Sequence, residues 1–170
     1  MLKILFAGEG GQGVQTAAQI LAKAVMKTGK RVSYIPNFGV EQRGGVSLAF
    51  LIVDDQQPVY PKFGEADILA IFSNRSLARV DQHIGENTKI ILTPAVSQKK
   101  IQNDEKQIFR IGNQFSHKVW NVMVLGKTVA LTKLVDKKIL KTAMDERFAR
   151  WFAKNPELKK LDHEALDSVL

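Results

Sequence analysis

Three glycines near the start of the chain have the spacing of a phosphate-binding loop. Gly8, Gly10 and Gly13 satisfy the pattern G-x-G-x-x-G, and Gly11 and Gln12 complete the segment. In loops of this kind the missing side chains let backbone amides approach a phosphate, and the following helix adds the positive end of its dipole. The spacing therefore predicts a site for a phosphorylated ligand. The alternative is that the glycines only allow a sharp turn and close helix–strand packing.

A second glycine-containing segment, residues 36–45, carries side chains suited to ligand contact. Phe38, Glu41 and Arg43 lie in it. Arg43 can make a forked contact to a phosphate, and Glu41 can orient Arg43. Alternatively, these two side chains only pair with each other or with a helix end. The glycines of this segment that we also assign to the candidate site are Gly39, Gly44 and Gly45.

The elements around the two loops predict how they are positioned. A short apolar run precedes the first loop, and an apolar stripe at helical spacing follows it over residues 14–25. Residues 31–35 then predict a second strand, parallel to the first and directly beside it, because strand–helix–strand units cross over in this way. Both loops should therefore lie at one edge of the sheet, where open parallel sheets bind ligands.

The rest of the chain continues the alternation of strands and helices. We predict a three-layer α/β/α Rossmann-like fold with a mainly parallel sheet, in a single domain over residues 1–170. The apolar helix at 120–134 should be buried. Further strands are expected at 46–53, 68–72, 89–92 and 108–111, and helices at 74–84, 120–134, 137–154 and 158–170.

Ordinary NAD binding is disfavoured by the residues of the second strand. A dinucleotide fold of this type needs an acidic residue about 20 positions after the glycine loop to hold the ribose hydroxyls. The chain has Ser33, Tyr34, Ile35 and Pro36 in that region. The glycine loop must therefore serve another ligand or another purpose.

Composition excludes several function classes. The 170 residues contain no cysteine, which rules out disulfides, thiolate nucleophiles and cysteine-ligated iron–sulfur clusters within the chain. No apolar run approaches the roughly 20 residues that span a bilayer, and the start lacks the features of a secretory signal, so we expect a cytoplasmic protein without a membrane partner. The net charge of +8 is spread along the chain and mixed with acids, whereas nucleic-acid binders usually concentrate it. No nucleic-acid partner is expected.

Residues for catalysis are scarce. His83, His117 and His163 are isolated from other potential ligands in the sequence, so we expect packing or surface roles for them and no metal site. Neither a G-x-x-x-x-G-K-[ST] phosphate loop nor a G-x-S-x-G hydrolase elbow is present. No catalytic residue is assigned, and the chain alone does not resemble a complete enzyme.

Four segments in order resemble one known family. The glycine loop at 8–13 and the segment at 36–45 are followed by an apolar strand at 67–72 and by an Asn-x-x-x-Leu-Gly helix at 121–126. This combination resembles the gamma subunit of 2-oxoacid:ferredoxin oxidoreductases, which include the pyruvate, 2-oxoglutarate and ketoisovalerate enzymes. The resemblance covers most of the chain, although the basic C-terminal tail departs from it.

The resemblance implies a role within a larger enzyme. Such complexes oxidatively decarboxylate a 2-oxoacid, form acyl-CoA and reduce ferredoxin, with thiamine diphosphate, Mg and Fe-S clusters in the partner subunits. The expected partners are the alpha and beta subunits, with delta as a further candidate, and ferredoxin indirectly. The gamma subunit would bind no cofactor alone, would meet coenzyme A at its surface and would help to hold the complex together.

Two other function classes stay open at this stage. One is a stand-alone nucleotide-binding or regulatory module with the same glycine loop, and the other is a basic RNA-binding domain. Three features favour the subunit of a complex: the absence of an acidic residue to bind the ribose hydroxyls, the second glycine segment, and the dispersed charge. The 2-oxoacid itself is not fixed by the sequence, because the residues that select it should lie on other chains.

Overall fold

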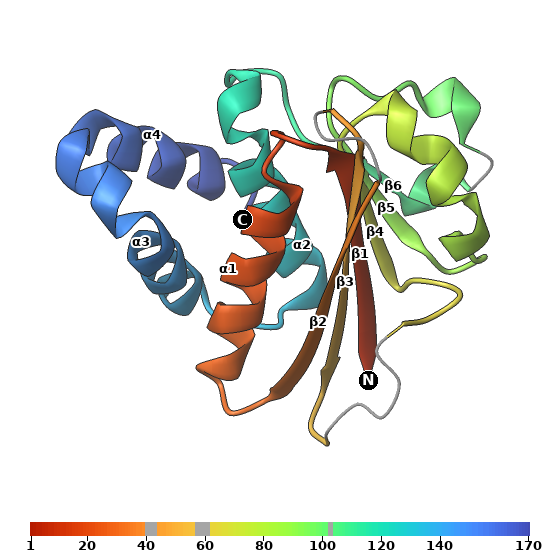
Figure 1. Ribbon diagram of the computed structural model, residues 1–170, viewed down its shortest axis with the longest axis horizontal. Helices are drawn as coiled ribbons and strands as arrows, with labels where there is room; N and C mark the ends of the chain where they lie inside the picture. Colours follow the sequence, from red (N-terminus) through yellow and green to blue (C-terminus); the bar gives the residue numbers. More distant parts are fainter. Residues whose placement is uncertain (40–43, 57–61, 102–103) are drawn as a thin grey trace.

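A six-stranded mixed sheet forms the centre of the molecule (Figure 1). The computed structural model describes residues 1–39, 44–56, 62–101 and 104–170. The strand order is β2-β3-β1-β4-β5-β6, and β3 is the strand that runs against the direction of the others. The strands are β1 (Leu2–Glu9), β2 (Arg31–Phe38), β3 (Val46–Asp54), β4 (Ile68–Ile71), β5 (Lys89–Leu92) and β6 (Ile108–Arg110).

The four α-helices of the described residues pack on one face of the sheet, where the larger part of the core lies (Figure 1). From β1, Ile4 and Phe6 point to this face, whereas Leu5 and Ala7 point to the other, as strand alternation requires. The helices are α1 (Val14–Met26), α2 (Trp120–Thr132), α3 (Lys137–Lys154) and α4 (Pro156–Asp167). The strands expected at 46–53, 68–72, 89–92 and 108–111 and the buried helix after residue 120 are confirmed within one or two residues.

The expected position of the second strand is wrong. β3 lies between β1 and β2 and pairs antiparallel with both, from Leu2↔Val53 to Glu9↔Val46 on one side. β3 is buried along most of its length, so it takes the inner position, whereas β2 is largely half-exposed and contains Pro36. Proline lacks the N–H that a central strand must donate on both sides, and it is therefore confined to edges. β1 and β2 still run in the same direction, so both glycine segments end at the same sheet edge.

The second face of the sheet is covered by short 3₁₀ turns and loops. In place of the helix expected at 74–84, the chain forms two 3₁₀ helices, η1 (Asn74–Arg79) and η2 (Asp81–His83). Asn74 does not cap a helix, because its side chain bonds instead to the loop after β5. Its Nδ2 donates to the Ala95 carbonyl and its Oδ1 accepts from the Ser97 amide, both at 3.0 Å. The other short 3₁₀ turns are η3 (Gln98–Lys100) and η4 (Glu105–Gln107). A further one, η5 (His117–Val119), packs with α2 and α4 on the helical face.

Among the described residues, no helix is long and apolar enough to cross a membrane. The same residues contain no group of three or more histidine, aspartate or glutamate side chains placed to hold a metal ion. The histidines have the packing and surface roles expected of them. His83 is buried and bonded to the Gly64 carbonyl, His163 is bonded to Asp145, and the exposed His117 contacts the Trp120 ring.

Candidate functional site

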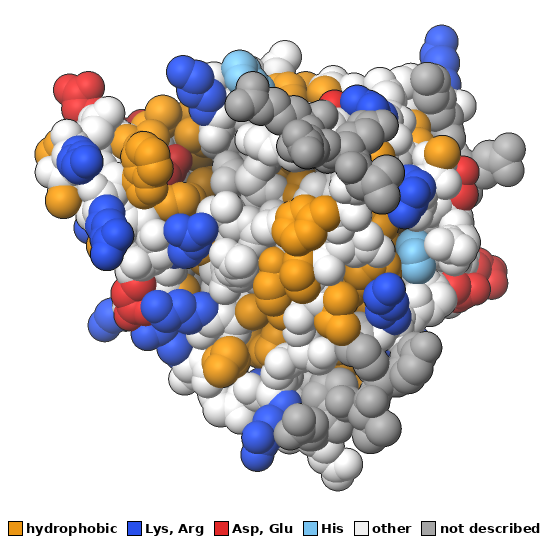
Figure 2. Space-filling view, in the orientation of Figure 1, with side chains coloured by type: hydrophobic (Ala, Val, Ile, Leu, Met, Phe, Trp, Pro, Cys, Tyr) orange, Lys and Arg blue, Asp and Glu red, His pale blue; other side chains and the backbone are white. Residues whose placement is uncertain are grey.

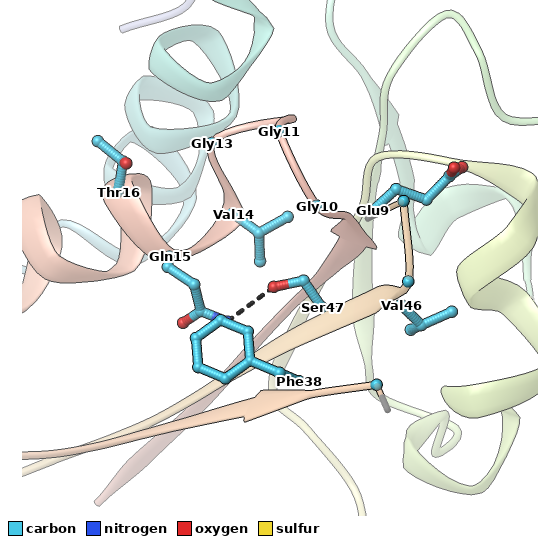
Figure 3. A pocket seen from close by; sticks show the side chains of 13 residues that line it. Glu9, Gly10, Gly11, Gly13, Val14, Gln15, Thr16, Phe38, Val46 and Ser47 are labelled. Atoms are coloured by element: carbon cyan, nitrogen blue, oxygen red, sulfur yellow. Dashed lines mark hydrogen bonds between the residues drawn. The ribbon is translucent and has the colours of Figure 1, made fainter. Parts of the chain in front are cut away.

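The two glycine segments meet at the carboxyl ends of β1 and β2. The Gly10 amide donates to the Gly45 carbonyl at 3.0 Å, and the Gly39 amide donates to the Val46 carbonyl at 2.8 Å. An open cavity of about 650 Å³ lies between the segments and the start of α1 (Figure 3). We call it the glycine cavity. Its lining residues are Glu9, Gly10, Gly11, Gly13, Val14, Gln15, Thr16, Phe38, Gly39, Gly44, Gly45, Val46 and Ser47.

The N-terminus of α1 opens onto the glycine cavity. Gly13 is the N-cap residue, in the left-handed conformation with φ of 77°, and no side chain caps the helix. The first turn of the helix, Val14 to Thr16, lines the cavity. Because the first amides of a helix have no partner within it, this wall presents donors and the positive end of the dipole. The arrangement is suited to an anionic group.

Glycines of the site serve two different purposes. Gly8 does not line the cavity, and an added Cβ there would be 2.7 Å from Gln12 Oε1 and 2.8 Å from Phe72 Cβ, so close packing requires glycine at this position. Gly11 has φ of 93° and nothing within 4 Å of an added Cβ, so only its backbone conformation demands glycine. Close packing therefore explains the glycine at position 8 and, against Asn121, part of the requirement at Gly13, whereas it does not explain Gly11, which borders the open cavity.

Gln12 holds the first glycine turn together. Its Oε1 accepts from the Glu9 amide at 2.8 Å. It also lines a second hollow of about 270 Å³, on the far side of the turn, with Gly11, Gly13 and residues from the start of α2. The other residues of this second hollow are Phe72, His117, Lys118, Trp120 and Asn121.

Phe38 and Gln15 shape the wall formed by the hairpin strands. Phe38 is 66% exposed at the end of β2, an unusual position for a large apolar ring and one suited to stacking on a ligand or a partner. Gln15 Nε2 donates to Ser47 Oγ and to the Leu48 carbonyl, both at 2.8 Å, and its Oε1 accepts from the Tyr34 hydroxyl at 2.7 Å (Figure 3). This network fixes α1 against β2 and β3. Burial raises the pKa of Tyr34, so the hydroxyl remains a donor.

Glu41 and Arg43, the charged pair proposed for the second glycine segment, lie outside the residues that the structure describes. Within the described lining of the cavity, the charged side chain is that of Glu9, whose Oε2 is 4.0 Å from Arg75 Nη1. The favourable field for an anion therefore comes from the helix terminus and the loop amides.

The structure brings together Gly10, Gly11, Gly13, Phe38, Gly39, Gly44 and Gly45 around one cavity, with Gly8 and Gln12 in supporting positions. Sequence reasoning missed Gln15, Thr16 and Ser47. Their signals were a polar first turn after the glycine loop and a serine inside an apolar strand. It also missed the contact between Asn121 and Gly13, which joins residues more than a hundred positions apart.

Comparison with known proteins decides the family. Residues 3–161 match the family model for pyruvate ferredoxin/flavodoxin oxidoreductase. The chain belongs to this family. It is 31% identical over 162 residues to the pyruvate/ketoisovalerate oxidoreductases common subunit gamma of Thermococcus kodakarensis, with 88% of each chain covered. The resemblance inferred from the four sequence segments is confirmed.

Solved structures share the fold of this family member. The gamma subunit of keto/oxoacid ferredoxin oxidoreductase from Geobacter sulfurreducens PCA has a TM-score of 0.74 at 25% identity, covering 99% of this chain and 95% of that one. The 2-oxoglutarate:ferredoxin oxidoreductase of Magnetococcus marinus has a TM-score of 0.80 at 20% identity, covering 98% of this chain and 30% of that one. In the second protein the shared fold is therefore one part of a longer chain.

Proposed function

We propose that the chain is the gamma subunit of a thiamine diphosphate-dependent 2-oxoacid:ferredoxin oxidoreductase. The complex would convert a 2-oxoacid, coenzyme A and oxidised ferredoxin into acyl-CoA, CO₂ and reduced ferredoxin. Family membership supports the reaction class. The observation that carries the role of this chain is the glycine cavity, with the uncapped N-terminus of α1 in its wall.

In this proposal the glycine cavity forms the coenzyme A side of the active-site cover. The amides around Gly11 and the first turn of α1 would hold an anionic pyrophosphate, because no side chain keeps it at a distance. The exposed Phe38 ring would contact the ligand or the neighbouring subunit. The Magnetococcus marinus enzyme with the same fold was solved with coenzyme A bound.

The remaining parts of the reaction are assigned to other chains. Thiamine diphosphate, Mg and Fe-S clusters would lie in the alpha, beta or delta subunits, and ferredoxin would be reduced there. Residues 1–170 would form one gamma-type domain that helps assembly in the cytoplasm. Thiamine diphosphate, when bound, supplies the carbanion chemistry of decarboxylation. This chain would position coenzyme A and exclude water.

A charge placed in the cavity wall tests this function. Thr16 lies in the first turn of α1 and lines the cavity. Thr16→Glu should preserve the fold, because an acid near a helix N-terminus is stabilising by about 0.3–1 kcal/mol. In the reconstituted complex the new carboxylate should repel the ligand and raise the KM for coenzyme A on the order of tenfold, which is about 1.4 kcal/mol.

The matched control is Thr16→Gln, which adds similar bulk without charge and should change the KM for coenzyme A less than twofold. Assembly of each variant is followed by size-exclusion chromatography. An unchanged KM for Thr16→Glu in a fully assembled complex would show that the glycine cavity does not bind coenzyme A. Equal effects of both variants would assign the result to bulk rather than charge and would also contradict the proposal.

A further inference from the structure

A third hollow lies at the corner where α3 meets α4, beside the start of α2. It measures about 180 Å³, and we call it the corner hollow. A water molecule in the liquid occupies about 30 Å³, so the corner hollow has room for the end of one side chain. Figure 2 shows a group of hydrophobic side chains on the surface over α4, with Lys and Arg side chains around it. The residues that matter here are Phe148 and Trp151 from α3, Asp162 from α4 and Lys118 before α2.

Asp162 is a buried carboxylate without a partner. It is 5% exposed and lines the corner hollow, and within the described part of the chain no hydrogen bond or ion pair satisfies it. Burial raises its pKa to about 6, and the charge of His163 acts in the opposite direction. Isolated buried carboxylates are costly unless an opposite charge or donors satisfy them. Asp162 therefore has room for an ion-pair partner at the corner hollow that the described residues do not supply.

Neighbouring carboxylates differ from Asp162 in this respect. Asp145, on the facing side of α3, accepts from Lys159 at 2.8 Å and is bonded to His163 at 2.6 Å. Asp167 pairs with Lys141 at 2.8 Å and with Lys137 at 3.0 Å. Asp145 and Asp167 thus have cationic partners, whereas the buried Asp162 has none among the described residues.

Trp151 provides an aromatic surface next to this carboxylate. Its side chain is 65% exposed although it is the largest apolar group on α3. The rings of Phe148 and Phe152 pack against each other with centroids 5.5 Å apart, and Phe148 lines the corner hollow together with Trp151. A cation above a tryptophan face is stabilised by the ring quadrupole. The corner hollow therefore combines a carboxylate and an exposed indole.

We propose that the corner hollow binds an arginine side chain from another protein subunit, with the guanidinium on Asp162 and against Trp151. Arginine fits better than lysine, because its planar group can pair with a carboxylate and stack on an aromatic ring at once. Lys118 does not fill this role, since its exposed side chain makes no ion pair with Asp162. Tryptophan and arginine are also the residues that most often dominate protein–protein binding energy.

The position of the corner hollow supports a subunit contact. It shares Lys118 and Asn121 with the second hollow, which in turn shares Gly11 and Gly13 with the glycine cavity. The second hollow is thus a neighbour of both the glycine cavity and the corner hollow. The identification of the partner as another oxidoreductase subunit rests on the proposed function. The ability of the corner hollow to bind arginine is independent of that function.

The test uses the isolated chain and a small probe, so its outcome is independent of coenzyme A use. N-acetyl-arginine amide is titrated to 100 mM while the Trp151 indole N–H signal is followed by NMR. Saturable shifts are expected with arginine amide and not with the neutral, similarly shaped N-acetyl-citrulline amide. The backbone amide signal of Asp162 is followed in parallel, because Trp151→Leu lacks the indole reporter. Asp162→Asn, followed at the indole, and Trp151→Leu, followed at this amide, should each weaken binding at least fivefold, and Asp145→Asn should leave it unchanged.

Several results would overturn the proposal. Equal shifts with the citrulline probe, no saturable shift with arginine amide, or full binding by Asp162→Asn would each exclude an arginine site. Tighter binding of N-acetyl-lysine amide would exclude the choice of arginine. In the reconstituted complex, Asp162→Asn should raise the dissociation constant of the subunits at least tenfold, and Asp145→Asn should leave it unchanged. An unchanged dissociation constant for Asp162→Asn would exclude a partner contact at the corner hollow.

Discussion

Gly13 combines two constraints that act on a single residue. Its φ of 77° is strained for any residue with a Cβ, and an added Cβ would lie 2.5 Å from Asn121 Nδ2. Gly11, two residues earlier, has the positive φ without any close neighbour. The pair therefore separates the energetic effect of backbone conformation from that of packing between α1 and α2.

We predict that Gly11→Ala lowers the free energy of unfolding by about 1–2 kcal/mol, the cost of the left-handed conformation. Gly13→Ala should cost about 1–3 kcal/mol more, because the methyl group overpacks against Asn121. Urea denaturation measures both. Combining Asn121→Ala with Gly13→Ala should remove this additional loss of stability, whereas combining it with Gly11→Ala should not change the loss there. Equal losses in the two single variants would show that the contact with Asn121 does not contribute to the cost of Gly13→Ala.

Asp162 should lower the free energy of unfolding as the pH rises, whereas a carboxylate with a cationic partner raises it. Its pKa is raised from 3.8 to about 6 in the folded chain, so the folded state favours the protonated form. The resulting destabilisation is absent below about pH 3.8 and complete above about pH 6. Asp162→Asn should therefore raise the free energy of unfolding at pH 7.5 by up to about 3 kcal/mol, and by much less at pH 4.5.

Asp145→Asn provides the opposite control. Partial burial acts to raise the pKa of Asp145, but hydrogen bonds from Lys159 and His163 outweigh it and hold the pKa below the usual value. Its stabilisation is present at neutral pH and is lost as pH falls, so Asp145→Asn should destabilise at pH 7.5. Urea denaturation at pH 7.5 and 4.5 checks both variants. Destabilisation by Asp162→Asn at pH 7.5 would show that Asp162 has a favourable partner in the isolated chain.

At the scale of elements, α2 and α4 meet through Gly126. An added Cβ there would be 2.7 Å from Val169 Cγ2 and 3.1 Å from the Leu166 carbonyl oxygen. Helix propensity alone predicts that Gly126→Ala stabilises by up to about 1 kcal/mol. We expect the reverse, a loss of about 1–3 kcal/mol, because backbone of the facing segment cannot move aside cheaply.

Hydrogen exchange should show this loss as faster exchange in α4, with β1 and β3 unchanged. Gly64→Ala is the control, since nothing lies within 4 Å of its added Cβ. It should be neutral or slightly stabilising, through the smaller entropy of the unfolded chain. A net gain in stability for Gly126→Ala would show that propensity outweighs packing at this crossing.

Local elements could be predicted from the sequence where one periodic pattern dominated. The stripe after residue 14 and the apolar runs of β3, β4 and β5 predicted their elements correctly. The order of strands could not be read in this way, because a crossover rule does not reveal that a later hairpin strand will enter between its two strands. Pro36 was the overlooked signal for an edge. Asn74 misled for a related reason: its partners lie 21 and 23 residues away.

For the molecule as a whole, convergence of the two glycine segments was predictable although their parent strands are not neighbours. Both strands run in the same direction, so their carboxyl ends share one edge, and the Gly10–Gly45 hydrogen bond joins the segments there. The shape of the glycine cavity was not predictable, because Gln15, Ser47 and Tyr34 meet only through the packing of α1 on β2 and β3.

We predict that the isolated chain does not reduce viologen or ferredoxin with pyruvate, 2-oxoglutarate or 2-oxoisovalerate in the presence of coenzyme A. The proposed function places thiamine diphosphate and the clusters in other subunits, so addition of those subunits should restore the activity. Anaerobic absorbance at the viologen band measures both conditions. Turnover by a preparation shown by mass spectrometry to contain this chain alone would contradict the assignment.

The inner position of β3 has a consequence for synthesis of the chain. β1 and β2 have no ladder with each other, and both need β3 as the partner between them. When residues 1–38 have left the ribosome, they therefore contain two strands that cannot yet pair. At about 5–20 residues per second, the further stretch to Asp54 takes roughly 1–3 s. During that interval the edge of β1 that receives β3 is open to other nascent chains. A pause in translation just before β3 should therefore favour aggregation more than one after Asp54, when only the edge that later receives β4 is still unpaired.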